Sequence, residues 1–262
     1  MLTRLIVHSW YTLGSYMLHP GRVTLIDPAP ALDPTDPIDI LEIVRDYVVE
    51  GRMATKMFPR RSLPVSRHFS QDFALELHGP EGAFKYDLLI EQDRRRADGC
   101  RSELETLWHD DACVAMYQHG RWSPAGPDDD DWGVDGDGQP GLVDARMSAV
   151  AQLDADADPR VAAFKRQLAR IRVVHTLPGF DPETREARAL ADLEAARPLL
   201  RDPELTLAVV LPNELSDAAL GPFLADALAA QQPERGAQLL LSSPRPYLLE
   251  RFRNLAQKPG QP

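Results

Sequence analysis

Residues 205–211 read Leu-Thr-Leu-Ala-Val-Val-Leu, and this continuous apolar run decides the fold. An uninterrupted apolar run of this length is typical of a strand buried on both faces of a parallel sheet. Residues 238–242 (Gln-Leu-Leu-Leu-Ser) predict a second such strand, and apolar residues at helical spacing from Leu220 to Leu228 predict a helix between the two. Another helix is expected from Pro246. The resulting strand–helix–strand–helix order favours a parallel sheet with crossover helices.

The N-terminal segment predicts a hairpin followed by a helix. Residues 2–7 and 22–26 are short, apolar and rich in β-branched side chains, and Pro20-Gly21 between them indicates a turn. Asp36 is a suitable N-cap for a helix whose first residue is Pro37 and whose apolar spacing continues up to Gly51.

The middle of the chain predicts an antiparallel meander. Four strand-length segments follow one another with turn residues between them: 73–77, 84–91, 104–108 and 112–118. An acidic polar loop follows at 124–141. After it, Asp158-Pro159 opens a predicted helix whose apolar face includes Val161, Phe164, Leu168 and Ile171.

Composition limits the classes of protein that the chain can belong to. The 262 residues have a formal net charge of -11, which disfavours binding to a nucleic-acid backbone. The 23 prolines exceed the usual share of about 5%, whereas the 16 glycines do not exceed theirs. With only two cysteines, no disulfide framework is expected, and no membrane-length apolar run is present. We therefore expect a cytoplasmic protein that makes no membrane contact.

The order of these elements resembles that of the SMC/RecF-like ABC-type ATPases, including the single-chain predicted ATPases related to RecF and the overcoming-lysogenisation-defect proteins. Segments 22–26, 74–91, 147–172 and 242–252 are similar to that family's phosphate-loop strand, lobe strands, post-lobe segment and switch strand with its helix. The resemblance implies an α/β fold: an ABC-ATPase-like mixed sheet with flanking helices. It also implies one domain over residues 1–262, with an antiparallel β lobe inserted at 72–145.

The predicted phosphate loop departs from the family. A phosphate loop needs glycines, whose N–H groups converge on the phosphates, and a lysine. Residues 27–37 contain neither. Four prolines remove backbone donors, and three carboxylates lie where phosphates would bind. A unit charge at about 4 Å is worth about 4 kcal/mol at an effective dielectric of 20, so this loop opposes ATP. The degenerate positions are Asp27, Pro28, Pro30, Asp33, Pro34, Thr35 and Asp36.

Two further catalytic elements of the family are altered. After its apolar strand the family has an Asp and a Glu that serve Mg²⁺ and the attacking water. Here Pro212-Asn213-Glu214 follows, so that Glu214 is the one relic candidate. The switch strand, which has a histidine in the family, has the relic Ser242-Ser243-Pro244.

Other potential functional sites have weaker support in the sequence. Neither register of the Asp135-to-Gly138 stretch supplies the ligand positions of a calcium loop. His109, Cys113, Cys100 and His119 lack the paired spacing of a zinc site, so no metal is expected. The basic residues between Arg52 and Arg67 are interpreted as a solvated loop, although contact with nucleic acid or an acidic partner is the alternative.

Three functional hypotheses follow. The first is a pseudo-ATPase without cofactor, with a structural, adaptor or regulatory role through contacts with an intact ATPase or with a second copy of itself. The second is an active ATPase in DNA repair or phage defence that uses ATP and Mg²⁺, with Glu214 as catalytic carboxylate and Arg60, Arg61 or Arg245 as phosphate contacts. The third is an unrelated α/β binding module.

Overall fold

The chain folds into two compact units. A computed structural model describes residues 1–11, 13–26, 36–63, 70–93, 99–118, 121–123, 143–154, 158–175, 182–211, 216–229, 236–243, 247 and 250. The parallel unit comprises Met1, Pro20–Glu42 and Arg170–Pro262, and the antiparallel unit comprises Leu2–His19 and Ile43–Ala169. Helix α1 (Pro37–Val49) begins in the first unit and ends in the second.

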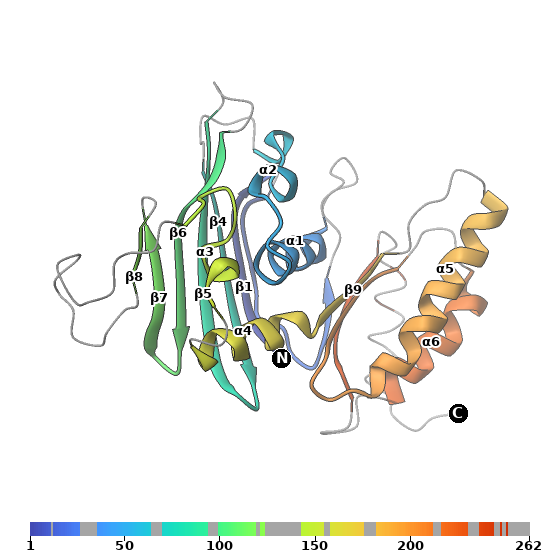
Figure 1. Cartoon of the computed structure of the whole chain (residues 1–262). Coiled ribbons are helices and arrows are strands. Elements are labelled where there is room, and N and C mark those ends of the chain that lie inside the picture. Colours follow the sequence, from blue (N-terminus) through green and yellow to red (C-terminus); the bar gives the residue numbers. More distant parts are fainter. Residues whose placement is uncertain are drawn as a thin grey trace. The chain divides into compact units, whose positions relative to one another are not determined.

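The antiparallel unit is built on a seven-stranded sheet of order β2-β1-β4-β5-β6-β7-β8 (Figure 1). The bounds of its strands are β1 Leu2–Trp10, β2 Leu13–Leu18, β4 Ser70–Gly79, β5 Gly82–Gln92, β6 Cys100–His109, β7 Ala112–Gln118 and β8 Arg121–Ser123. All neighbouring pairs in it are antiparallel. The predicted meander is confirmed in β4 to β7.

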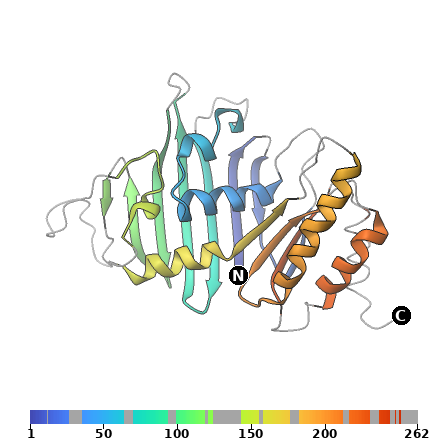
Figure 2. The ribbon, with the colours of Figure 1, turned by 45° about the vertical axis from the view of Figure 1, so that its right-hand side comes forward.

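Buried and more exposed side chains alternate along these strands, and the buried ones form the core of the antiparallel unit. Phe73, Leu75 and Leu77 of β4 are buried, and their alternating neighbours are more exposed, as expected for a sheet with one covered face. Helices α3 (Ala149–Gln152) and α4 (Pro159–Ala169) lie on one face of the sheet (Figure 2). Phe164 of α4 packs at a centroid distance of 5.4 Å from Tyr86.

A second aromatic cluster anchors the segment after α1. This segment contains α2 (Ala54–Met57) and the 3₁₀ turn η1 (Arg60–Ser62). Phe58 lies 5.2 Å from Tyr47, 5.3 Å from Phe73 and 6.2 Å from Trp10 between ring centroids. Contacts of this kind add to the burial of large apolar area, so Phe58 fixes the segment to α1 and to the sheet.

The hairpin between β4 and β5 depends on glycine. Gly82 has a φ of +110°, and a Cβ placed there would lie 2.3 Å from His109 Nε2. Because neither the backbone conformation nor the space admits a side chain, only glycine fits this turn.

The parallel unit contains a four-stranded sheet of order β3-β11-β10-β9 in which all pairs are parallel. The strands are β3 Val23–Ile26, β9 Ile171–His175, β10 Thr206–Val210 and β11 Gln238–Ser242. Helices α5 (Pro182–Ala196) and α6 (Asp217–Ala229) lie side by side on one face (Figures 1 and 2), and the turn η2 (Arg197–Arg201) follows α5. Leu207, Val209, Leu239 and Leu241 face these helices in one apolar cluster. The predicted α/β class, with parallel strands and crossover helices, is confirmed.

Two predictions about individual elements are wrong. Residues 2–7 and 22–26 do not form a hairpin, because β1 pairs with β2 and β4, whereas β3 pairs in parallel with β11. The helix that begins at Pro159 ends at Ala169, and Ile171 is the first residue of β9. In both cases pairing with a distant strand, which local patterns do not encode, determined the structure.

The helix predicted from Pro246 falls almost entirely outside the described residues. None of the helices in the described part of the chain is long and apolar enough to cross a membrane.

Candidate functional site

The candidate site lies in the parallel unit, where the carboxyl ends of its strands meet the beginning of α1. Ligands of open parallel sheets bind at this edge of the sheet. Of the residues predicted there from sequence, Asp36, Ser242 and Ser243 are described. The remaining predicted positions, Asp27, Pro28, Pro30, Asp33, Pro34, Thr35, Glu214 and Pro244, lie outside the described residues.

Asp36 caps helix α1. Its Oδ1 accepts a hydrogen bond from the backbone N–H of Ile38 at 2.9 Å, and its backbone carbonyl accepts one from the N–H of Asp39 at 2.9 Å. In return, Asp39 Oδ2 accepts a hydrogen bond from the backbone N–H of Asp36 at 3.3 Å. This is a reciprocal capping box, with Asp in the position that Glu usually occupies. Together with Pro37, which has no N–H, these bonds use the donors of the first turn.

The second carboxylate oxygen of Asp36 accepts a hydrogen bond from the Ser242 hydroxyl at the end of β11. Ser242 is fully buried, as is Ser243 after it. Two residues that the sequence assigned to separate motifs, the phosphate loop and the switch strand, are thus in contact.

His175, the last residue of β9, completes the arrangement. Its Nε2 lies 2.9 Å from Glu42 Oε2, and its Nδ1 lies 3.5 Å from Asp39 Oδ1. The roles of His175, Asp39 and Glu42 were not predicted from the sequence. The spacing of Asp39 and Glu42 on one face of α1 was a visible signal, but the histidine is brought to them by the fold. We call Asp36, Asp39, Glu42, His175 and Ser242 the α1 cluster.

Burial and charge shift the protonation of the α1 cluster. Burial raises the pKa of Asp36 and raises that of Asp39 to about 6. The hydrogen bond to Glu42, followed by attraction to Asp39, raises the pKa of His175 despite its partial burial. The cluster therefore retains protons at a pH where isolated side chains of these types lose them.

Chemically, the α1 cluster is suited to hold protons or cationic groups and is poorly suited to phosphate. Asp36 and Asp39 accept hydrogen bonds from N–H groups at the start of α1, and the imidazole of His175 lies between Asp39 and Glu42. An anion-binding N-terminus needs open N–H donors and positive potential. Within the described ranges, no three His, Cys, Asp or Glu side chains are arranged to hold a metal ion.

The antiparallel unit has a buried polar cluster of its own, centred on Glu105 of β6. This carboxylate is 1% exposed and accepts hydrogen bonds from Tyr86 Oη (3.0 Å), Ser148 Oγ (2.9 Å), and the N–H groups of Ala149 (2.8 Å) and Val150 (3.3 Å). Burial raises its pKa, and the hydrogen bonds from Ala149, Ser148 and Val150 act in the opposite direction. Since its partners belong to β5 and to the start of α3, Glu105 fastens α3 to the sheet.

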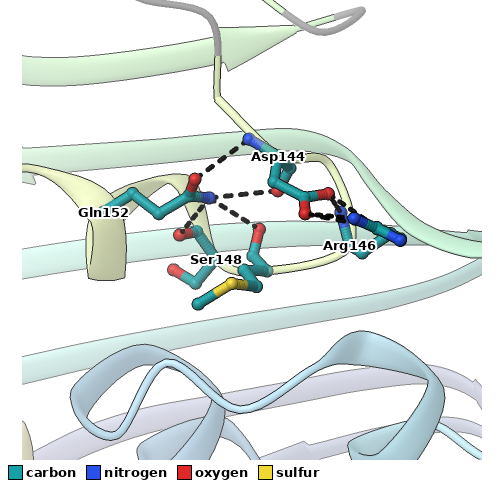
Figure 3. Close-up of polar contacts among 5 residues, drawn as sticks. Asp144, Arg146, Ser148 and Gln152 are labelled. Atoms are coloured by element: carbon teal, nitrogen blue, oxygen red, sulfur yellow. Dashed lines mark hydrogen bonds and ion pairs between the residues drawn. The ribbon is translucent and has the colours of Figure 1, made fainter.

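The segment before α3 is held by further polar contacts (Figure 3). Gln152 Oε1 accepts the N–H of Asp144 at 2.9 Å, and Gln152 Nε2 donates to the carbonyl oxygens of Asp144 at 3.0 Å and Ser148 at 3.1 Å. Asp144 also pairs with Arg146 at 2.7 Å. These contacts close a compact turn, and we interpret them as structural.

The topology defines the chain as an α/β protein with one antiparallel and one parallel sheet. A scan against known protein families and a search of curated proteins find no match. Among solved structures, the chain is similar to the SMC head domain from Thermotoga maritima, with a TM-score of 0.40 and 9% sequence identity over 95% of this chain and 91% of that chain. Because a similarity of this size says nothing about activity, function has to be argued from the residues of the site.

Proposed function

We propose that the protein is a catalytically inactive, ATPase-like protein whose role is structural, adaptor or regulatory and depends on contacts with other proteins. The observation that carries the proposal is that backbone N–H donors at the start of α1 are already bonded to side chains of the same helix end. Its first-turn donors bind Asp36 itself, and the carboxylates of Asp36 and Asp39 accept hydrogen bonds from backbone N–H groups at the end of the helix that favours an anion in phosphate-binding loops.

The charge at the start of α1 has the wrong sign for a phosphate. A nucleotide phosphate at this position would meet the carboxylates of Asp36 and Asp39, and it would have to displace the capping bonds of α1. Loss of a cap costs about 0.5–2 kcal/mol, and each nearby like charge adds a repulsion of several kcal/mol at short range. His175 offers one positive charge, but Glu42 already holds it at 2.9 Å.

The sequence supports the proposal independently. The loop from Asp27 to Asp36 has no glycine or lysine, so it lacks the residue types with which such loops bind phosphate. Pro212 and Pro244 occupy two further positions where a catalytic or sensing side chain is expected from the resemblance.

The test is a titration of the purified protein with fluorescent ATP in the presence of Mg²⁺, with unlabelled ATP as competitor. We expect no saturable signal through the micromolar range. Micromolar binding that unlabelled ATP displaces would contradict the proposal. If phosphate is also released, the Glu214→Gln variant decides the role of that residue, because release that survives the substitution excludes Glu214 as the catalytic carboxylate.

A further inference from the structure

Strand β6 places two polar side chains on the buried face of the antiparallel sheet that a regular strand would separate. Ser102 and Glu105 are each 1% exposed, although residues three positions apart lie on opposite faces of a regular strand. A β-bulge explains the difference, because the register with β5 shifts by one residue and Glu103 has no residue opposite it. The bulge therefore turns both polar side chains toward the interior of the unit.

Tyr47 of α1 is fully buried beside these two residues. Burial, followed by the charge of Glu105, raises the pKa of Tyr47 well above its ordinary value, and burial also raises the pKa of Glu105. The Ser102 hydroxyl acts on both pKa values in the opposite direction, so it lies near both groups. Tyr47, Ser102 and Glu105 all belong to the antiparallel unit, and their arrangement is a property of that unit by itself.

These three side chains have hydrogen-bonding capacity that their neighbours do not use. In the part of the chain that the structure describes, neither Tyr47 Oη nor Ser102 Oγ has a partner at the distance and angle of a hydrogen bond. On Glu105, Oε2 accepts three hydrogen bonds, whereas Oε1 accepts one, from the N–H of Ala149. Since an unbonded buried polar group is costly, such groups are almost always bonded to protein or to ordered water.

We propose that the antiparallel unit binds one water molecule in its interior, between Tyr47 Oη, Ser102 Oγ and Glu105 Oε1. Water fits the chemistry of these atoms because it both donates and accepts. It accepts the hydrogen of the Tyr47 hydroxyl and donates to Ser102 Oγ and Glu105 Oε1, which makes the three hydrogen bonds typical of a buried water. An anion would be repelled by Glu105, so a neutral ligand of this size is the one that the site accepts.

The water connects elements that are distant in sequence. Tyr47 belongs to α1 and Ser102 to β6, while Glu105 also accepts the N–H groups of Ala149 and Val150 at the start of α3. Helix α1 is thus linked through the water to the same carboxylate that fastens α3. The site therefore adds a polar connection to the apolar packing that holds these helices on the sheet.

Oxygen-17 magnetic relaxation dispersion of the full chain tests the site in solution, because it counts buried waters that exchange slowly with the bulk. The Ser102→Val variant replaces the hydroxyl with methyl groups that occupy the position of the water, and we expect the count to fall by one. Thr106→Val is the matched control. It removes a buried hydroxyl from the opposite face of the same strand, one that donates to Asp87 Oδ2 at 3.2 Å, and it should leave the count unchanged.

A crystal structure of the wild type, at a resolution that shows ordered waters, tests the same site without any substitution and decides alone if Ser102→Val does not fold. We expect electron density for one water within hydrogen-bond distance of Tyr47 Oη, Ser102 Oγ and Glu105 Oε1. Direct hydrogen bonds among these three side chains with no water between them would overturn the proposal. So would an equal count of long-lived waters in the wild type and Ser102→Val, or an equal loss in Thr106→Val. None of these results concerns nucleotide, so the ATP titration stands or fails independently.

Discussion

His175 Nε2 lies 2.9 Å from Glu42 Oε2, so the last residue of β9 is ion-paired with the second turn of α1 although 133 positions separate the two in sequence. The pair joins an edge strand of the parallel sheet to the helix that follows β3. Because the hydrogen bond raises the pKa of His175, the contact is linked to protons, and its contribution to stability depends on pH.

The first prediction concerns the loss of this histidine. A group whose folded pKa is raised stabilises fully below its unfolded pKa, about 6.5 for histidine, and loses that contribution as the pH rises through the folded pKa. The His175→Gln variant should therefore lose about 1–2 kcal/mol of unfolding free energy at pH 6 and less at pH 9. Urea denaturation at the two pH values measures it. His19→Gln, at an exposed position, is the control, and an equal loss at both pH values would contradict the ion pair.

The second prediction concerns Asp39, whose pKa is raised to about 6. Because the folded state holds this proton more tightly than the unfolded state, the stabilisation is present below about pH 4 and is lost as the pH rises through 6. The difference from the ordinary value of 3.8 corresponds to on the order of 2–3 kcal/mol. Asp39→Asn keeps an acceptor for the N–H of Asp36, so it should flatten the decline in stability between pH 4 and 7.

Denaturation curves at half-unit steps of pH measure this decline. Asp202→Asn provides a matched control, since Asp202 is exposed and caps the N–H of Glu204 in the same way. An unchanged slope in Asp39→Asn, or an equal change in the control, would show that Asp39 is not the titrating group.

The third prediction concerns Ser242. Removal of this buried hydroxyl leaves one oxygen of Asp36 without its partner, which should raise the pKa of Asp36 further and cost about 1–3 kcal/mol. Thr206→Val is the control, because it removes another buried hydroxyl of the same sheet, one that donates to Gln238 Oε1 at 2.9 Å. A double-mutant cycle with Asp36→Asn should give a coupling of at least about 0.5 kcal/mol, whereas additive effects would show that the two residues do not interact.

Local patterns in the sequence were sufficient for much of the fold. The apolar run at 205–211 contains β10, and the range 238–242 coincides with β11. Asp36-Pro37 at the start of α1 followed from the chemistry of helix ends, which depends on neighbouring residues. These features could be predicted because the information for them lies within a few positions.

The features that could not be predicted from the sequence depend on pairing between residues that are distant along the chain. Residues 171–175 contain adjacent β-branched valines, but Ile171 also fits the apolar face of the preceding helix, and only its pairing with Thr206 decides for a strand. Likewise, Pro20-Gly21 indicates a turn without indicating which strands it separates. The α1 cluster could not be predicted as a unit because β9, β11 and α1 meet only in the folded sheet.

The last prediction tests the buried carboxylate of Glu105. Glu105→Ala would leave Tyr86, Ser148 and two backbone N–H groups without their acceptor, and each unsatisfied buried group costs about 1–3 kcal/mol. We expect a loss of about 3–5 kcal/mol after partial relaxation. Glu105→Gln keeps one acceptor oxygen and should lose less, and Tyr86→Phe, which removes a single bond, should lose least.

Urea denaturation ranks these variants, and limited proteolysis of residues 143–153 reports whether the start of α3 is released. Glu103→Ala is the matched control, because Glu103 lies on the same strand and forms a surface ion pair with Arg101 at 3.5 Å. Such pairs contribute at most about 1 kcal/mol. If Glu105→Ala cost no more than Glu103→Ala, the four hydrogen bonds would not hold α3 to the sheet, because an acceptor with four buried donors cannot be removed at the cost of a surface charge.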